Sequence, residues 1–226
     1  MHQIYNYKNA LGTILCRKEN TLVPYATALR EMQTHVEDII AYKKPEFIWF
    51  LSHPPTYTAG RSAQKHEVLD IGATPLHHIE RGGRVTYHGP GQLVGYLLID
   101  LRQRRRDIRH FVHNLEQWMV NVLAELGVEA QTYPDRIGIW VTRARGTPLT
   151  SEEKIGAIGL KVKKWVTFHG FAFNINPDLT AFSKIVPCGL SDYKVTSLEK
   201  LSISMTPDEI ITLFRKHLPS FIQAIS

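Results

Sequence analysis

The stretch "RGGRVTYHGPGQLVGYLLIDL", residues 81–101, decides how the rest of the chain is interpreted. Two runs within it, 83–89 and 93–101, carry the β-branched, aromatic and aliphatic residues typical of strands, and "PGQ" separates them. Four glycines within its first eleven residues, at 82, 83, 89 and 91, are costly to order unless the backbone must bend or be approached closely. The segment therefore predicts two strands whose glycines form either tight hairpin turns or the wall of a ligand pocket.

Helical and strand patterns alternate around this stretch. Apolar residues at helical spacing predict helices over 23–43 and 107–127, and a third helix is expected from Thr206, where Pro207 fits the first turn and Glu209 completes a capping box. Strand-like runs stand at 46–53, 137–142, 154–162 and 165–176, and the prolines and glycine of 54–60 are expected to end the first of them. The pattern predicts an α/β or α+β fold, between which periodicity does not choose.

The composition indicates one globular domain spanning residues 1–226. The chain is 43% hydrophobic, which suffices for a large core, and its two cysteines show no metal or disulfide spacing, so a reducing compartment is expected. We see no apolar run of about 20 residues and no secretory signal pattern. These features predict a soluble, cytoplasmic protein without a membrane partner.

Positive charge is in excess, with 27 Lys and Arg against 21 Asp and Glu. The basic residues concentrate at 102–110 and 161–165, and each run is either a phosphate-binding patch or a solvated face. A basic nucleic-acid-binding module is one interpretation. No zinc-finger, homeodomain or RNA-recognition pattern is present, which argues against a nucleic-acid partner.

Three glycine-punctuated segments, 81–93, 154–162 and 168–175, are the candidate pocket walls. None is a phosphate loop or a dinucleotide fingerprint. His88 and His169 each precede a glycine, so two imidazoles facing one site are expected, as acid/base groups, hydrogen-bonding groups or metal ligands. Metal is the weakest of these, because no third ligand stands at suitable spacing, and no metal site is predicted.

Cys188, in "IVPCGLSD" (185–192), lies between a proline and a glycine, a context that presents a thiol on a bend. A nucleophilic cysteine needs a nearby cation that favours the thiolate. Lys154 is one candidate among several lysines and the two histidines. It opens an apolar, glycine-rich segment, where desolvation favours proton exchange near neutral pH.

Five ordered blocks, at 53–60, 81–101, 111–118, 154–175 and 185–198, resemble the lipoyl(octanoyl) transferase family, and the likeness extends from about residue 10 to residue 200. The resemblance implies the biotin and lipoate protein ligase fold, a curved mixed sheet flanked by helices. It implies an acyltransferase that moves an octanoyl group from octanoyl-acyl carrier protein to a lysine of an apo lipoyl domain through a cysteine thioester, in lipoate biosynthesis. The acceptors would be 2-oxoacid dehydrogenase complexes and the glycine cleavage H protein, and neither ATP nor a metal would be required.

Individual residues match the family's functional positions. Cys188 matches the nucleophile, and Lys154 matches the lysine that lowers the cysteine pKa and shuttles protons. The implied substrate-binding residues fall in three segments, with His169 as a supporting residue beside the third: Arg81, Gly82, Gly83, Arg84, Val85, Thr86, Tyr87 and His88; Ala157, Ile158 and Gly159; Gly170, Phe171 and Ala172.

Two segments depart from the family pattern: 133–141 and the longer polar insertion at 143–153. An ATP-dependent lipoate or biotin ligase on the same fold is the alternative function. Such ligases activate a free acid as an acyl-adenylate and need no nucleophilic cysteine. The presence of Cys188 in its turn favours the transferase.

Overall fold

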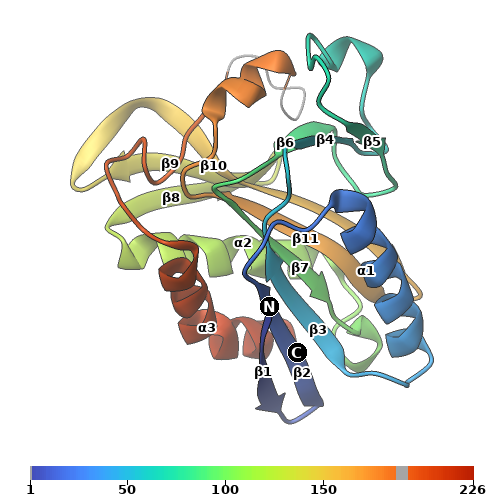
Figure 1. Cartoon of the computed structure of the whole chain (residues 1–226). Coiled ribbons are helices and arrows are strands. Elements are labelled where there is room, and N and C mark those ends of the chain that lie inside the picture. Colours follow the sequence, from blue (N-terminus) through green and yellow to red (C-terminus); the bar gives the residue numbers. More distant parts are fainter. Residues whose placement is uncertain (1, 187–192) are drawn as a thin grey trace.

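The structure is a computed structural model that describes residues 2–186 and 193–226 (Figure 1). Within these residues the main sheet has nine strands, in the order β1-β2-β3-β7-β11-β10-β9-β8 with β12 beside β10. The strands are β1 (His2–Asn9), β2 (Gly12–Glu19), β3 (Glu46–Leu51), β7 (Gln92–Leu98), β8 (Val128–Tyr133), β9 (Arg136–Ala144), β10 (Thr147–Lys163), β11 (Val166–Asn174) and β12 (Lys194–Val195). Pairs β2/β3 and β10/β12 are parallel and the others antiparallel, which confirms the predicted mixed sheet.

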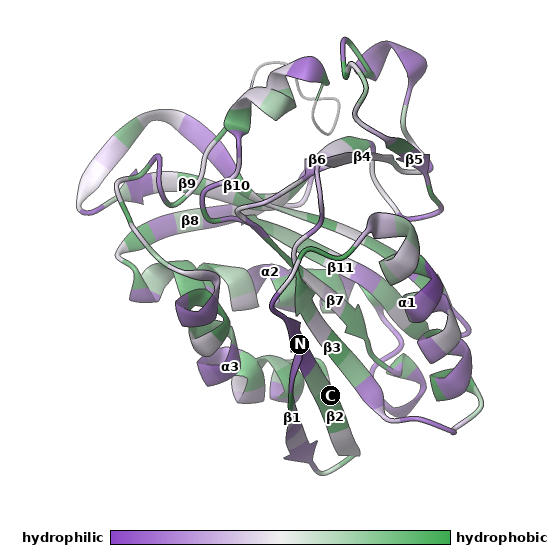
Figure 2. Cartoon of the chain, viewed as in Figure 1, coloured by the Kyte–Doolittle hydropathy of each residue, from purple (hydrophilic) through white to green (hydrophobic). Residues whose placement is uncertain are grey.

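Helices cover both faces of this sheet (Figure 1). They are α1 (Tyr25–Ile40), α2 (Ile108–Glu125) and α3 (Pro207–Ala224), with short 3-10 helices η1 (Lys65–Glu67), η2 (Leu101–Gln103) and η3 (Leu179–Lys184). Alternation along β3 builds the two cores, because successive side chains of a strand face opposite ways. Phe47, Trp49 and Leu51 pack with α1, whereas Ile48 and Phe50 pack with α2 and α3. Figure 2 shows β3 and β7 as largely apolar strands between these helices.

The predicted helices are confirmed with slightly shorter bounds. The Asp107 carboxylate accepts the His110 N–H at 3.0 Å at the start of α2, and Gly127 adopts a φ of +69° just after the helix ends. At α3 the predicted capping box of Thr206 and Glu209 forms, with Pro207 in the first turn. Helices α2 and α3 therefore begin where a local side chain accepts an otherwise unpaired N–H, whereas α1 begins after Pro24 without a side-chain cap.

A second sheet, in the order β5-β4-β6, corrects one prediction. It consists of β4 (Thr56–Ala59), β5 (Leu76–His78) and β6 (Val85–His88). Residues 54–60 were expected only to end a strand, and that expectation is wrong for 56–59. Pairing with β5 and β6 supplies the backbone partners of this segment, so the prolines at 54 and 55 precede a strand rather than exclude one.

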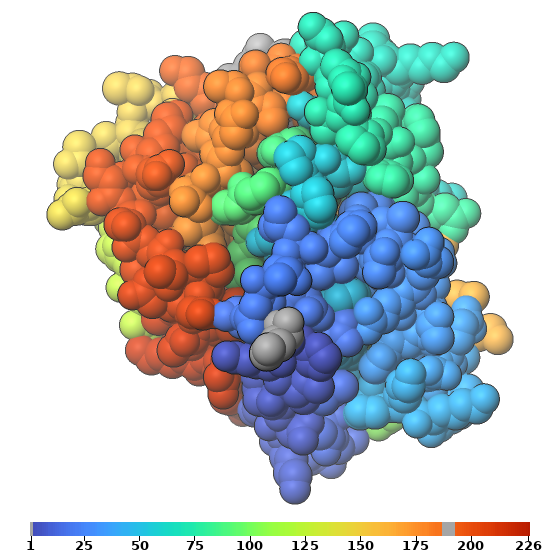
Figure 3. Space-filling model, in the orientation of Figure 1, coloured from blue at the N-terminus to red at the C-terminus, as the bar shows by residue number. Residues whose placement is uncertain are grey.

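Two hairpins lie outside the predicted strands. The polar insertion at 143–153 lengthens β9 and β10 around Arg145 and Gly146, both with positive φ, and it forms the yellow projection in Figure 1. The N-terminal hairpin β1/β2 lies against α3 on the face shown in Figure 3. There the Arg215 guanidinium stacks 3.9 Å from the centroid of the Tyr5 ring.

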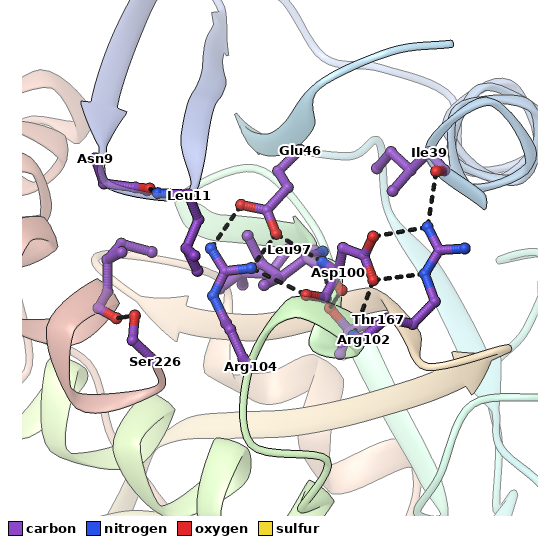
Figure 4. Close-up of polar contacts among 12 residues, drawn as sticks. Asn9, Leu11, Ile39, Glu46, Leu97, Asp100, Arg102, Arg104, Thr167 and Ser226 are labelled. Atoms are coloured by element: carbon purple, nitrogen blue, oxygen red, sulfur yellow. Dashed lines mark hydrogen bonds and ion pairs between the residues drawn. The ribbon is translucent and has the colours of Figure 1, made fainter. Parts of the chain in front are cut away.

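The basic run at 102–110 is partly structural (Figure 4). Arg102 pairs with Asp100 at 2.6 Å and donates to the carbonyls of Ile39 and Ile40 at the end of α1. The Arg104 guanidinium is buried and forms an ion pair with Glu46. Neither arginine belongs to a solvated face or is available as a phosphate-binding patch. Within the described residues, no helix is both long and apolar enough to cross a membrane.

Candidate active site

A hollow of roughly 500 Å³, its open mouth included, lies between β6 and the main sheet. It brings together residues from all three segments that the resemblance assigns to substrate: Arg81, Gly83, Arg84, Thr86, His88, Ala157, Ile158, Gly159, Gly170, Phe171 and Ala172. His169 also lines it, together with Tyr25, Val94 and Tyr96. Segments far apart in sequence thus converge on one cavity, here called the main hollow.

Three residues of the first predicted segment do not line the main hollow. Val85 and Tyr87 alternate with Thr86 and His88 along β6, so they face the other side and pack near Phe182. Gly82 instead donates its N–H to the Leu160 carbonyl at 2.7 Å, which ties the segment to β10. Along β6, strand alternation, which residue composition does not reveal, separates the lining residues from their neighbours.

Arg81 is a buried cation at the wall of the main hollow. Its Nη2 donates to the Thr58 carbonyl at 2.9 Å and to Thr58 Oγ1 at 2.7 Å, and its Nη1 donates to the Gly82 carbonyl at 2.9 Å. A Cβ at Gly159 would lie 2.8 Å from Arg81 Cδ. Glycine at 159 therefore lets the arginine side chain pass against the backbone of β10.

His88 is held by a buried polar network. The Gln92 amide donates to the Tyr87 carbonyl and to Asn174 Oδ1, which leaves Gln92 Oε1 to accept the His88 Nδ1 hydrogen at 2.7 Å. His88 Nε2 is then an acceptor, 3.4 Å from Thr58 Oγ1. Burial, and next the neighbouring His53, lower the pKa of His88 to about 3.

His169 carries backbone strain as well as an unusual environment. Its φ of +60° lies in the left-handed region although it is within β11. Burial, and next the charge of Arg81, lower the pKa of His169 to about 3. Both histidines line the main hollow, as predicted, and their lowered pKa values keep both imidazoles neutral at neutral pH.

The sequence reasoning missed the aromatic end of the main hollow. Tyr96 Oη lies 2.7 Å from His53 Nε2, and His53 Nδ1 lies 2.6 Å from the Val23 carbonyl. Burial lowers the pKa of His53 to about 4, so its Nδ1–H donates to Val23 and its Nε2 accepts from Tyr96. A tyrosine in the otherwise apolar run "LVGYLLI" (93–99) was the available signal, because a buried hydroxyl needs a partner.

A second hollow, of roughly 300 Å³, adjoins the first and shares Thr86, Ala157 and Ala172 with it. Lys154 lines this second hollow and is buried, at 7% exposure. Its Nζ donates to the Ile137 carbonyl at 2.9 Å and lies 5.1 Å from the centroid of the Trp140 ring. The expected desolvated setting of Lys154 is confirmed.

The second hollow is bordered by the chain that follows the predicted nucleophile. Cys188, Pro187 and Gly189 lie outside the described residues. The described chain resumes at residue 193, and Val195 in β12 is the register partner of Lys154 and lines the second hollow. Thr196 donates its N–H to the Lys154 carbonyl at 2.9 Å, and its own carbonyl accepts the Asn174 amide at 3.0 Å.

Chemically, the two hollows combine apolar and main-chain walls with neutral imidazoles, one buried guanidinium and one buried amine. Such a surface suits an acyl chain, which has no polar groups to recognise, next to a reacting carbonyl. Among residues 2–186 and 193–226, no three His, Cys, Asp or Glu side chains converge as a metal site would require.

Comparison with known proteins gives consistent results. The family model "Lipoyl protein ligase A/B catalytic domain" matches residues 24–219. The chain is 46% identical to an octanoyltransferase of Zymomonas mobilis, over 95% of this chain and 97% of that one, and 48% identical to an octanoyltransferase of Novosphingobium aromaticivorans, over 94% of each. Among solved structures, a bi-partite lipoate protein ligase of Thermoplasma acidophilum has a TM-score of 0.67 at 17% identity, covering 89% of this chain and 82% of the other. A lipoate-protein ligase A bound with ATP has a TM-score of 0.66 at 16% identity, covering 91% and 85%. These two structures support the fold.

Proposed function

The chain belongs to the family of lipoyl protein ligase A/B catalytic domains, and we propose that it is an octanoyltransferase acting through a cysteine thioester. In this proposal octanoyl-acyl carrier protein is the donor, and the acceptor is a lysine on the apo lipoyl domain of a 2-oxoacid dehydrogenase complex or on the glycine cleavage H protein. The reaction takes place in the cytoplasm and uses neither ATP nor a metal.

The observation that carries the proposal is the shared wall of the two hollows. The main hollow is lined by residues from three separate segments. Lys154 lines the adjoining hollow, and Thr86, Ala157 and Ala172 line both. An acyl chain in the main hollow would have its carbonyl directed toward the second one. The high identity to octanoyltransferases over nearly the whole chain supports the same assignment.

The first chemical step is exchange of one thioester for another. The Cys188 thiolate attacks the octanoyl carbonyl, the bond to the carrier sulfur breaks, and the carrier thiolate leaves. Lys154 gives its proton to that sulfur and becomes a neutral amine. The exchange is nearly neutral in energy, and a thiolate is an intrinsically good nucleophile, so no activated nucleotide is needed.

The second step is transfer to the acceptor amine. Neutral Lys154 takes a proton from the acceptor ammonium, the free amine attacks the acyl-enzyme carbonyl, and the Cys188 thiolate leaves. The second amine proton goes to solvent, so an amide, free thiolate and charged Lys154 result. A buried lysine suits this exchange because desolvation disfavours the ammonium form, so that the amine can lose and regain a proton within one reaction cycle.

Intact-mass measurement after incubation with octanoyl-acyl carrier protein, without ATP, tests the nucleophile and donor together. We expect one added octanoyl group on the wild-type chain and none on Cys188→Ala, with Cys16→Ala as the matched control because Cys16 is buried and lies outside both hollows. An unchanged adduct on Cys188→Ala would contradict the assignment.

The same assay separates the transferase from the ligase alternative. A strict requirement for ATP with free octanoate as donor would identify a ligase. For Lys154→Ala we expect slower acylation and a higher Cys188 pKa, read from the pH dependence of alkylation. An alkylation profile equal to wild type would remove Lys154 from the proposed role.

A further inference from the structure

Glu116 is a buried carboxylate that the proposed reaction does not use. It lies in the middle of α2 at 6% exposure, between the core residues Leu115 and Trp118. Placing a carboxylate in such surroundings costs several kcal/mol unless the charge is compensated. A carboxylate in the apolar stripe of the helix therefore requires a hydrogen-bond donor or a positive charge nearby.

The partner is a single peptide group of β9. Glu116 Oε1 accepts the N–H of Gly138 at 3.0 Å. The carbonyl of that same peptide group belongs to Ile137 and accepts Lys154 Nζ at 2.9 Å. One peptide dipole thus lies between a carboxylate and an ammonium, with its positive end toward the former and its negative end toward the latter. Hydrogen bonds in series polarise and strengthen one another where the dielectric is low.

Backbone geometry allows the Lys154 side chain to lie close to the 137–138 peptide group. Gly138 has a φ of +132°, and a Cβ there would lie 2.5 Å from Lys154 Cε and 2.7 Å from the Gly156 carbonyl oxygen. On β10 the register shifts between Lys154 and Gly156, which leaves Ile155 as an extra residue in the ladder. Such bulges redirect neighbouring side chains. Glycine on one strand and a bulge on the other together let the lysine reach the 137–138 peptide.

We propose that Glu116 is a positioning residue for Lys154, and that its carboxylate holds the Lys154 ammonium charged and in place through the 137–138 peptide group. The catalytic consequence rests on the proposed function: Lys154 keeps its proton until the carrier thiolate leaves. The electrostatic link between the two side chains is independent of that function.

Other charged groups near the pair act on it less directly. His113, one turn earlier on α2, faces Glu116, and Arg136 on β9 shares the Trp140 ring with Lys154 while pairing with Glu152. Burial raises the pKa of Glu116, while the Gly138 N–H, His113 and Lys154 each lower it.

The test is a titration of Lys154 in full-length protein labelled with ¹³C at lysine Cε, with the Lys154 resonance assigned by its loss in Lys154→Arg. Glu116→Gln keeps an acceptor for the Gly138 N–H but removes the charge. We expect the pH midpoint of Lys154 deprotonation to fall by about 1, a tenfold change in the ratio of ammonium to amine. Glu125→Gln, at the end of the same helix and paired with Lys216, is the matched control and should leave the midpoint unchanged.

Reciprocity gives a second measurement that does not depend on the folding of Glu116→Gln. If the charges are coupled, Lys154→Gln must raise the midpoint of the Glu116 carboxyl, read from its ¹³Cδ shift, by a similar amount. The proposal is overturned if neither midpoint moves, or if the Glu116 carboxyl titrates alike with and without the lysine charge.

Activity separates this proposal from the proposed function. If the Glu116–Lys154 link and the proposed function both hold, Glu116→Gln shifts the pH dependence of octanoyl transfer to the acid side, together with the Lys154 midpoint. A shifted midpoint with an unchanged transfer profile would uphold the Glu116–Lys154 link and refute the catalytic role of Lys154.

Discussion

The buried histidines of the site make the fold sensitive to acid, and the size of the effect follows from their surroundings. His53, His88 and His169 have pKa values lowered to about 4, about 3 and about 3, chiefly by burial. In the unfolded chain a histidine titrates near its ordinary pKa of about 6.5. Between about pH 4 and 6.5 the unfolded state therefore binds more protons than the folded state, and stability is lost as the pH falls.

The magnitude is calculable for each histidine. Lowering the pH from 7 to 5.5 stabilises the unfolded state by about 1 kcal/mol per histidine that stays neutral in the fold, so about 3–4 kcal/mol for three. His35, whose pKa is also lowered by burial, acts in the same direction. Glu46 and Glu116 act in the opposite direction, because burial raises the pKa of each carboxyl and protonation then favours the folded state.

Urea denaturation followed by tryptophan fluorescence, at pH 7 and 5.5 and equal ionic strength, measures this loss. His169→Asn removes one titrating group and retains a residue that tolerates positive φ, so we expect its loss of stability between the two pH values to be about 1 kcal/mol smaller than in wild type. His66→Gln, at an exposed position, is the control and should show the wild-type loss. Equal losses for wild type and His169→Asn would refute the reasoning.

Two further predictions concern stability. In Gly170→Ala the new Cβ would lie 2.0 Å from the Gly95 carbonyl oxygen, and we expect the free energy of unfolding to fall by about 2–4 kcal/mol, against less than about 1 kcal/mol for Gly82→Ala, in urea denaturation. Arg104→Met removes the ion-pair partner of Glu46, whose side chain is only 14% exposed, and should cost about 3–5 kcal/mol, most of which the double variant with Glu46→Met recovers in a double-mutant cycle. If the losses in free energy of unfolding of Arg104→Met and Glu46→Met simply add in the double variant, the second prediction is contradicted.

The regular elements were predictable where local sequence and tertiary structure agree. Helix α3 carries its own capping box, and α1 and α2 carry apolar stripes at helical spacing, so their existence needed no knowledge of the rest of the chain. Strand β4 was not predictable in this way. Its segment begins after two prolines, and the bonds that make it a strand come from residues 76–78 and 85–88. Tertiary pairing overrode a local break signal.

The candidate site shows the same division. Sequence spacing drew attention to His88, His169 and Lys154, and the structure confirms that the histidines share a cavity and that the lysine is buried. The sequence did not reveal Glu116, because a single glutamate within an apolar helical stripe looks like a surface residue at the edge of the stripe. The charge becomes informative only when Gly138 and Lys154, on other elements, are placed beside it.

From sequence, the glycines could form either hairpin turns or the wall of a ligand pocket. In the structure both roles occur, at different glycines. A Cβ at Gly91, at the turn before β7, would lie 2.5 Å from the Asn176 carbonyl oxygen, so this glycine permits a tight approach of two backbones. Gly159 and Gly170 line the main hollow but also lie against Arg81 and the Gly95 carbonyl. The cavity wall is therefore built from strands packed too closely for side chains, and the same close packing that fixes β10 and β11 leaves bare main chain facing the space where an acyl chain would lie.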